Sequence, residues 1–299
     1  MKQMLKRFVP AEIGHAIHRR VHGIGVPYDN LYHCCTWKSA SQWFVELFSH
    51  PHVVEYSALD VVTLATWFDR LRSVGDIDFD RPDDVRGLLT AKLPATFAYP
   101  PKTVGTTLYY SRGEFLNLPL PARYRAFFVM RDPRDLVVSY YFSMRDSHVE
   151  NAWVKATREQ LRHLDEDQGL HFVIGQLATE GFFDILRSWS PATLTEPNLA
   201  VFRYEDLATD PDRFVRTLLA WLEIRLPEAK LLEVCRDTAF SRLSGRDRGE
   251  EDSTSHLRKG VSGDWRRHLS KAHLDRLKAE SGDLAADLGY ESASAGASS

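Results

Sequence analysis

Residues 34–44 read CCTWKSASQWF and stand where an apolar segment gives way to a helical pattern. Leu31 to Cys35 is typical of a buried strand, and the apolar residues after it share one helix face: Trp43, Phe44, Leu47 and Phe48. Lys38 lies at the junction, beside Ser39 and Ser41. The first turn of a helix has unpaired backbone N–H groups and a positive dipole end. The stretch therefore indicates an anion site, although a lysine in an ordinary loop is an alternative.

The same alternation recurs twice further along the chain. Ala126 to Met130 reads as a strand, and Asp132-Pro133-Arg134-Asp135 as the start of a helix, with Asp132 as its cap. Leu199 to Phe202 is a third strand, and Asp210-Pro211 starts another helix. Strands that alternate with helices predict an α/β fold: a single domain with a central parallel sheet and helices on both faces. Ligands of such sheets bind beyond the carboxyl ends of the strands.

Two other basic segments are candidates for anion binding. In RDPRDLVVS, residues 131–139, Arg131 follows the strand and Ser139 lies about two helical turns further on. In RKGVSGDW, residues 258–265, two cations precede Gly260, which permits close backbone approach. A helix cap with a surface ion pair of Arg134, and a basic turn, are the alternatives. Three anion sites on one sheet suit a nucleotide that carries phosphates at both ends of its ribose.

Composition narrows the classes of protein. The chain has 299 residues, 43% hydrophobic and 26% charged, with a net charge of -3, so a nucleic-acid partner is not expected. Its three cysteines do not suggest a disulfide framework, and we expect a reducing, cytoplasmic location. No apolar run is long enough to span a bilayer, and no metal-ligand pattern stands out. The expected organisation is a basic helical segment at 1–26, a domain at 27–290 and a disordered tail at 291–299.

Three motifs in this order resemble those of the cytosolic-type sulfotransferases, which use 3′-phosphoadenosine 5′-phosphosulfate (PAPS). The first, residues 37–43, WKSASQW, is similar to Pro-Lys-Ser-Gly-Thr-Thr-Trp, with Trp37, Ala40 and Gln42 as departures. RDPRDLVVSYYF and RKGVSGDW resemble the second and third motifs closely. The resemblance spans residues 34–267 and implies a P-loop-like phosphosulfate-binding loop. Alanine in place of the family's glycine is expected to fit only if the φ of Ala40 is negative.

The resemblance also implies the roles of individual residues. The loop would hold the 5′-phosphosulfate through Lys38, Ser39, Ala40, Ser41 and Gln42. Trp43 would stack on adenine, whose pocket would be completed by Tyr204, Thr238 and Phe240. The 3′-phosphate would be held by Arg131, Ser139, Arg258, Lys259 and Gly260. In-line displacement would move the sulfuryl group to a hydroxyl or amine without a metal.

A general base for the acceptor is the missing element. Relatives place a histidine about twenty residues before the Arg131 equivalent, and this chain has no histidine between His52 and His148. Relatives that act on polysaccharides use a glutamate near the position of Asp60, so the expected catalytic set is Lys38, Asp60 and Ser139. Three other residues remain candidates for the base: Glu55, Glu114 and His148. Asp60 could instead cap a helix.

Other classes of protein and other features stay open. A P-loop-type nucleotide kinase would share the sheet but should contain Gly-x-x-x-x-Gly-Lys-Ser/Thr, which is absent. A non-catalytic nucleotide-binding relative would bind without turnover. The acceptor would be a small molecule or a glycan, and a set of aromatic residues either lines its pocket or fills the core: Trp67, Phe68, Phe97, Tyr99, Tyr109 and Tyr110. The charged segment Ser244 to His256 is a surface loop or a lid.

Overall fold

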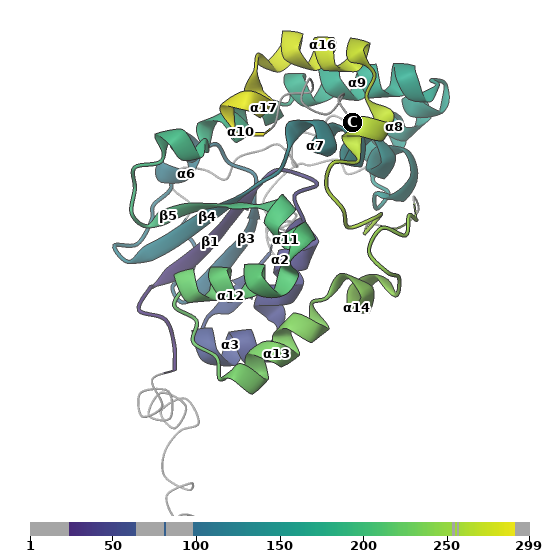
Figure 1. Cartoon of the computed structure of the whole chain (residues 1–299). Coiled ribbons are helices and arrows are strands. Elements are labelled where there is room, and N and C mark those ends of the chain that lie inside the picture. Colours follow the sequence, from purple (N-terminus) through teal and green to yellow (C-terminus); the bar gives the residue numbers. More distant parts are fainter. Residues whose placement is uncertain (1–23, 64–80, 82–97, 253–254, 256, 291–299) are drawn as a thin grey trace, which may run out of the picture.

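A five-stranded parallel sheet forms the centre of the molecule (Figure 1). The computed structural model describes residues 24–63, 81, 98–252, 255 and 257–290. The strands follow the order β2-β3-β1-β4-β5, and every neighbouring pair is parallel. Their bounds are β1 Asn30–Cys35, β2 Asp60–Val62, β3 Thr103–Leu108, β4 Tyr124–Met130 and β5 Leu199–Arg203.

Helices connect the strands and cover the sheet. Up to β5 they are α2 Ser41–Ser49, α3 Pro51–Ser57, α6 Arg112–Leu116, α7 Pro133–Phe142, the π-helix η2 Ser143–Ser147, α8 Ala152–Arg162, α9 Glu166–Thr179, α10 Phe182–Ser188 and the 3-10 turn η3 Pro191–Thr193. After β5 they are α11 Tyr204–Thr209, α12 Pro211–Trp221, α13 Glu228–Asp237, α14 Phe240–Ser244, α15 Trp265–His268, α16 Lys271–Ser281 and α17 Leu284–Asp287.

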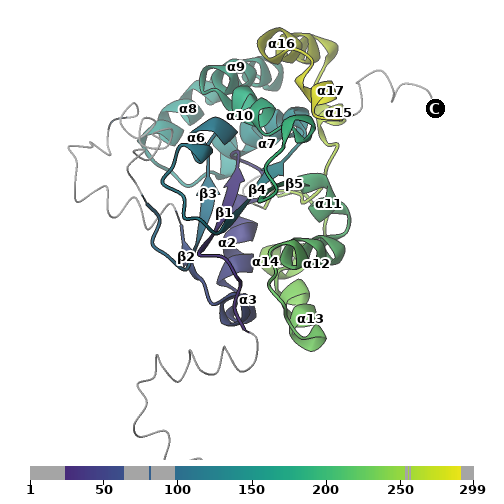
Figure 2. The same ribbon diagram turned by 90° about the vertical axis from the view of Figure 1, so that its left-hand side faces the viewer.

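Two hydrophobic cores lie on opposite faces of the sheet. Because successive side chains of a strand point to opposite faces, Tyr32 and Cys34 of β1 join one core, while Leu31 and Cys35 join the other. The first core is closed by α7, α8, α9 and α10, and the second by α2, α12 and α13. Figures 1 and 2 show the sheet between these two groups of helices. The predicted α/β fold, with helices on both faces, is confirmed.

The predicted strands and helix starts agree with the structure. β1, β4 and β5 cover the three predicted strands, with ends that differ by one or two residues. Asp132 caps α7 and accepts from the backbone N–H of Arg134, and Asp210 caps α12 and accepts from the backbone N–H of Arg213; a proline follows each cap. The sequence analysis missed β2 and β3. β2 is only three residues long, and the TVGTTL of β3 lacks the large apolar residues that mark the other strands.

The predicted N-terminal helix and C-terminal tail fall largely outside the described residues. Residues 24–26 are not helical: the N–H groups of Gly25 and Val26 donate to the carbonyls of Tyr56 and Ser57, at 2.9 and 3.2 Å. The last described residue, Tyr290, donates through its hydroxyl to Glu205 at 3.1 Å. Contacts of the domain therefore begin before residue 27 and extend to the predicted boundary at 290.

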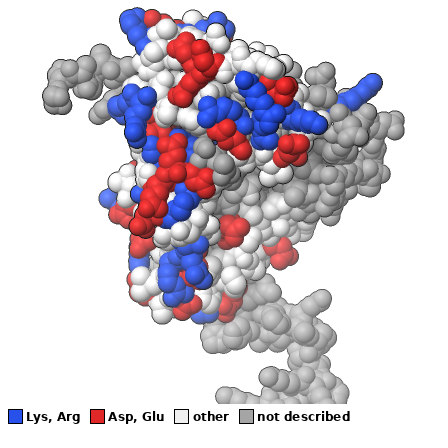
Figure 3. Space-filling model, turned by 90° about the vertical axis from the view of Figure 1, so that its right-hand side faces the viewer, with Lys and Arg blue, Asp and Glu red and all other residues white. Residues whose placement is uncertain are grey.

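The surface and the cysteines fit the composition. On the face drawn in Figure 3, basic and acidic side chains intermingle rather than gather into one-sign patches. Cys34, Cys35 and Cys235 are buried free thiols. Among the helices that the structure describes, none is long and apolar enough to cross a membrane.

Candidate active site

The site forms at the point where the order of strands in the sheet reverses, next to β1. β1 lies between β3 and β4, so the chain builds one side of the sheet first and then the other. Cys35 pairs with Val129, and therefore the loop after β1 and the loop after β4 leave the same edge. The Arg131 guanidinium donates to the carbonyl of Lys38 and lies over the ring of Tyr204, with its carbon 4.2 Å from the centroid. The first two basic segments thus meet at the carboxyl edge, as expected for a ligand site.

The loop between β1 and α2 alternates the sign of its backbone φ. Lys38 has φ 66° and Ala40 has φ 62°, while Ser39 between them does not have a positive φ. Such alternation turns successive N–H groups to one side, as in anion-binding nests. No side chain caps the start of α2, so its first N–H groups add to this concave surface. The loop is preorganised for an anion.

The expectation of a negative φ at Ala40 is wrong. Its φ lies in the left-handed region, which costs an L-residue roughly 1–2 kcal/mol. The surroundings hold the loop in this form: Ser39 is fully buried, and its hydroxyl is 2.8 Å from that of Thr36. The loop therefore keeps the conformation for which relatives use glycine and accepts the strain.

One cavity is shared by almost all residues for which nucleotide binding was predicted. Its lining residues are Lys38, Ala40, Ser41, Gln42, Trp43, Arg131, Ser139, Tyr204, Leu207, Ala208, Phe240, Arg248, Leu257, Arg258, Lys259, Gly260 and Val261. Ser39 and Thr238 do not line it. Thr238 supports the wall from behind, because its carbonyl accepts from the Trp43 indole at 2.7 Å. Arg248 is a lining cation that the motifs did not indicate.

Lys38 is the most perturbed cation of the cavity. Burial, together with the positive charges of Arg131 and Arg258, lowers its pKa to about 7. Its ammonium donates to the Ser143 hydroxyl at 2.9 Å. Ser143 begins η2 and was not identified from the sequence. An anion in the cavity would offset the repulsion and favour the charged form of Lys38.

The third basic segment is attached to the second by a carboxylate. Asp135 of α7 accepts from the backbone N–H groups of Gly263 and Trp265, at 2.5 and 2.9 Å. Gly260 has φ 66°, and a Cβ there would lie 2.7 Å from the Phe240 ring, so only glycine fits. These contacts place residues 258–265 against the start of α7, which sequence spacing could not show.

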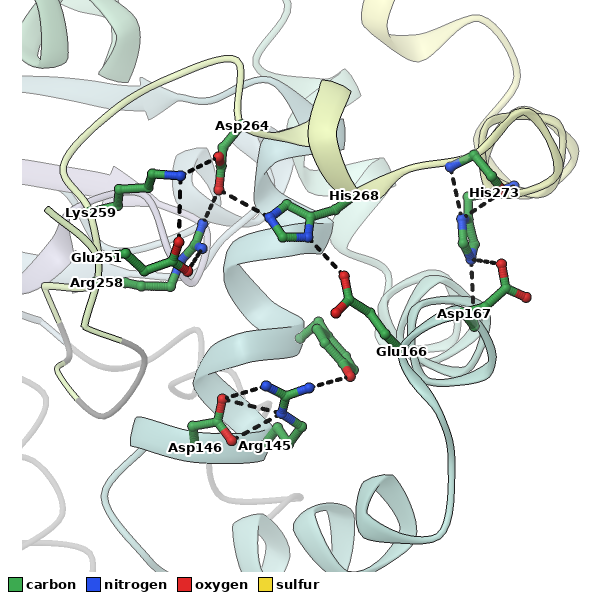
Figure 4. A network of polar contacts seen from close by, with 12 residues as sticks. Arg145, Asp146, Glu166, Asp167, Glu251, Arg258, Lys259, Asp264, His268 and His273 are labelled. Atoms are coloured by element: carbon green, nitrogen blue, oxygen red, sulfur yellow. Dashed lines mark hydrogen bonds and ion pairs between the residues drawn. The ribbon is translucent and has the colours of Figure 1, made fainter. Parts of the chain in front are cut away.

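Acidic side chains hold the two cations of this segment (Figure 4). Asp264 accepts from Arg258 at 2.6 Å and from Lys259 at 2.7 Å. Burial alone would raise the pKa of Asp264, but hydrogen bonds from His268, Lys259 and Arg258 hold it well below its usual range. Glu251 is the second partner, 2.5 Å from Arg258 and 3.5 Å from Lys259. Arg258 and Lys259, both predicted to bind phosphate, therefore form ion pairs with carboxylates.

The charged segment 244–256 is described except for residues 253, 254 and 256. Hydrogen bonds to backbone carbonyls, in place of apolar contacts, hold this polar segment. The Arg246 guanidinium donates to the carbonyls of Glu250, Leu257 and Arg258, at 2.8, 2.6 and 3.0 Å. The N–H groups of Gly249 and Asp252 donate to the carbonyls of Lys259 and Arg258, at 2.9 and 3.0 Å. The segment thus lies along the third basic segment without an apolar face.

The alternative role of Arg134 in a surface ion pair is also wrong. Arg134 pairs with Asp132 at 2.7 Å, and both side chains are buried. The Arg134 guanidinium lies over the Trp265 ring, 4.0 Å from its centroid. This cation therefore stabilises the helix start and its contact with the third segment, and it does not line the cavity.

Asp60 does not meet the geometric requirement for a base beside Lys38. It begins β2 and does not cap a helix. Asp60 pairs with Thr103, which pairs with Asn30 at the amino end of β1. Lys38 lies beyond the opposite end of β1, about 16 Å of strand away at 3.3 Å per residue. The assignment of Asp60 as catalytic base is therefore corrected.

Two other candidate bases serve local structure. Glu55 of α3 pairs with Lys230 of α13 at 2.9 Å, which lowers the pKa of Glu55 through the hydrogen bond from that lysine. Glu114 accepts from the N–H and hydroxyl of Ser111, at 2.8 and 2.6 Å, in the capping box of α6. His148, at the end of η2, is the one candidate whose pKa the Lys38 charge helps to lower.

The aromatic residues expected either to line an acceptor pocket or to fill the core have different surroundings. Trp67, Phe68 and Phe97 lie outside the described residues. Tyr99 and Tyr110 are buried in a core, whereas Tyr109 contacts Trp37, with ring centroids 6.0 Å apart. Trp37 also meets three aromatic rings of the helical layer: Tyr140, Trp153 and Phe182. An aromatic cluster therefore adjoins Lys38 on the chain.

Asp167, His171 and His273 bring three potential metal-ligand atoms together. His273 Nδ1 accepts from the N–H of Ser270 at 3.0 Å, which places its proton on Nε2. Nε2–H then donates to the carbonyl of Asp167 at 2.9 Å (Figure 4). These hydrogen bonds use both nitrogens in helix packing, so the cluster has a structural role.

The chain is similar to known sulfotransferases in sequence and in fold. The profile of the sulfotransferase domain matches residues 122–289. Sulfotransferase 6B1 of Danio rerio is 26% identical over 207 residues, 64% of each chain. Sulfotransferase 2A1 of Homo sapiens is 24% identical over 176 residues, 56% of this chain and 58% of its own length. The chain thus spans less than two thirds of these relatives.

Two solved structures share the fold. Mouse sulfotransferase SULT7A1, complexed with PAP, superposes with a TM-score of 0.53 at 16% identity, covering 89% of this chain and 90% of its own. Retinol dehydratase, in complex with androsterone and the inactive cofactor PAP, gives a TM-score of 0.50 at 13% identity, covering 92% and 86%. At such identities the likeness concerns the fold.

Replacing Ala40 by glycine should stabilise the protein by about 1 kcal/mol, because the strain of a left-handed alanine exceeds the extra chain entropy of glycine. Unfolding in urea measures the change. Ala279→Gly, at an exposed position of α16, should instead destabilise by about 1 kcal/mol. A loss of stability in Ala40→Gly would contradict the strain at this position.

Proposed function

Because the chain belongs to the sulfotransferase domain family, we propose that it transfers a sulfuryl group from PAPS to a hydroxyl or amine of an acceptor. One observation carries the proposal: three segments distant in sequence bring five cationic side chains to one cavity. These are Lys38, Arg131, Arg248, Arg258 and Lys259. Trp43, Tyr204 and Phe240 line the same cavity and offer ring faces for a base. This combination suits a nucleotide with phosphates at both ends of its ribose.

Different residues of the site would have different roles in the transfer. The nest at Lys38 to Ser41 would hold the 5′-phosphosulfate, and Arg131, Ser139, Arg258 and Lys259 would hold the 3′-phosphate. The acceptor oxygen attacks sulfur in line, and the electron pair of the breaking S–O bond goes to the 5′-phosphate. Lys38 would stabilise that oxygen by leaving Ser143 and donating to it. A small-molecule or glycan acceptor and a cytoplasmic location remain part of the proposal.

We propose that Glu251 and the charged segment move when the nucleotide enters. The cavity volume is about 100 Å³, against roughly 300–1,000 Å³ for sites that hold small ligands. Glu251 lies on the two cations proposed for the 3′-phosphate and belongs to the segment that lies along them. We therefore propose that the 3′-phosphate displaces Glu251 during binding.

Adenosine 3′,5′-bisphosphate (PAP) should raise the melting temperature of the protein far more than AMP, because only PAP carries the 3′-phosphate. Equal shifts from the two nucleotides would refute the 3′-phosphate site.

Lys38→Ala should keep the fold and lower transfer from labelled PAPS at least 100-fold. Binding of PAP without transfer to any acceptor would instead indicate a non-catalytic nucleotide-binding protein.

Affinity for PAP should fall as pH rises above 7, because Lys38, with a pKa of about 7, then loses its charge in the free protein. One proton is taken up on binding, so the dissociation constant should rise by up to about tenfold per pH unit. Calorimetry between pH 7.5 and 9 keeps the phosphates ionised. Lys38→Arg stays charged and should bind with little pH dependence. The same slope in both proteins would assign the proton to another group.

Glu251→Gln should bind PAP about fivefold more tightly, since a partly exposed ion pair of ~1 kcal/mol no longer has to be broken. Glu250→Gln is the matched control: Glu250 accepts from the N–H of Asp247 at 3.1 Å and belongs to the same segment. It should leave affinity unchanged. Weaker binding by Glu251→Gln would show that Glu251 supports the nucleotide site and does not compete for it.

A further inference from the structure

His148 is joined to Lys38 through Ser143. The Lys38 ammonium donates to the Ser143 hydroxyl at 2.9 Å, and the Ser143 carbonyl accepts from the His148 N–H at 2.7 Å. These residues bracket η2, a π-helical turn that follows α7. π-Helical turns inside helical segments are frequent at functional sites. The turn brings a histidine, seventeen positions after Arg131 in the sequence, within electrostatic reach of Lys38.

The hydrogen bond of its ring defines which nitrogen of His148 can act as a base. Nδ1 lies 3.0 Å from the carbonyl oxygen of Val149. A carbonyl only accepts, so Nδ1 carries the proton of the neutral ring. Nε2 is then the nitrogen with the lone pair, as a general base requires.

Burial and neighbouring positive charges both favour the neutral form of this ring. Burial lowers the pKa of His148, and the positive charges of Lys38 and Arg158 lower it further, against the opposing hydrogen bond to Val149. Arg158 of α8 also fixes the backbone: it donates to the carbonyls of His148 and Met144, at 2.9 and 3.1 Å. Among the described residues of this region, Arg145 pairs with Asp146 at 3.0 Å and Arg158 with Glu150 at 3.3 Å.

We propose that His148 is the general base of the transfer, which deepens the proposed function and depends on it. Nε2 takes the proton of the acceptor hydroxyl while the acceptor oxygen forms its bond to sulfur. The S–O bond to the 5′-phosphate breaks, and its electron pair stays on the phosphate oxygen beside Lys38. The products are a sulfate ester, PAP and a protonated imidazole, which returns its proton to water. His148 thus replaces the histidine that the chain lacks before Arg131.

The test compares two acceptors that differ in their need for a base. His148→Gln is assayed at pH 8 with labelled PAPS and either 2-naphthol, which is un-ionised at this pH, or p-nitrophenol, which is largely ionised. Turnover with 2-naphthol should fall about 100-fold, and turnover with p-nitrophenol by less than a few fold. The acidic limb of the pH–rate profile should disappear with the side chain. His163→Gln, whose exposed ring pairs with Glu159 at 3.2 Å, is the control and should change neither rate.

The outcomes separate this proposal from the proposed function. PAP binding by calorimetry should be equal in wild type and His148→Gln; its absence in the wild type would contradict the proposed function. Unchanged turnover of 2-naphthol, or equal losses with both phenols, would overturn the role of His148. If wild type sulfates neither phenol, hydrolysis of PAPS by water takes their place, with the same expected loss.

A measurement on the wild type covers a variant that fails to fold. Nitrogen NMR of the PAP complex reports the tautomer of each histidine directly. A proton on Nδ1 of His148 and a bare Nε2 are expected. A proton on Nε2 in the neutral ring would overturn the proposal without any acceptor being known.

Discussion

The constraint on which this structure depends is the gathering of positive charges around one cavity, where Lys38 is buried. Lys38, Arg131 and Arg258 repel one another there, and the lowered pKa of Lys38 is the direct consequence. Such a cluster persists only if other groups supply negative charge. Asp135, Asp264 and Glu251 do so in the structure described. In a complex, a bound phosphate would supply negative charge to the same cations. A carboxylate and a phosphate would then be alternative partners of these cations.

The three acids are not equivalent in this exchange. Asp135 accepts from two backbone N–H groups, and Asp264 is buried against Arg258, Lys259 and His268, so both are parts of the framework. Glu251 is about one third exposed and belongs to the charged segment, whose movement we propose for nucleotide entry. The fold thus separates the acids that position the cations from the acid that competes for them. Nothing in the sequence spacing of these three residues shows that difference.

Much of the fold was predictable because its elements carry local signals. The alternation of β1 and β4 with capped helices follows from apolar runs and from the Asp-Pro starts at Asp132 and Asp210. β2 and β3 were missed because a three-residue edge strand and a threonine-rich strand have no strong pattern of their own. The site was predictable as far as the motifs extend. The prediction of Asp60 as the base was wrong because its distance from Lys38 in the sequence does not show at which end of the parallel strands it lies.

The base proposed for the reaction shows how the same charges can serve two steps. Lys38 must be positive to stabilise the leaving phosphate, whereas His148 must be neutral to accept a proton. Placing them within electrostatic reach satisfies both, since the charge on Lys38 disfavours a second charge on His148. Once the sulfuryl group has moved, the leaving phosphate bears the new negative charge and offsets Lys38, so a proton on His148 becomes less unfavourable. Under the proposed mechanism, the transfer of the proton to His148 and the growth of charge on the leaving phosphate would therefore be coupled through one ammonium group, which gives a reason for a histidine at the end of η2.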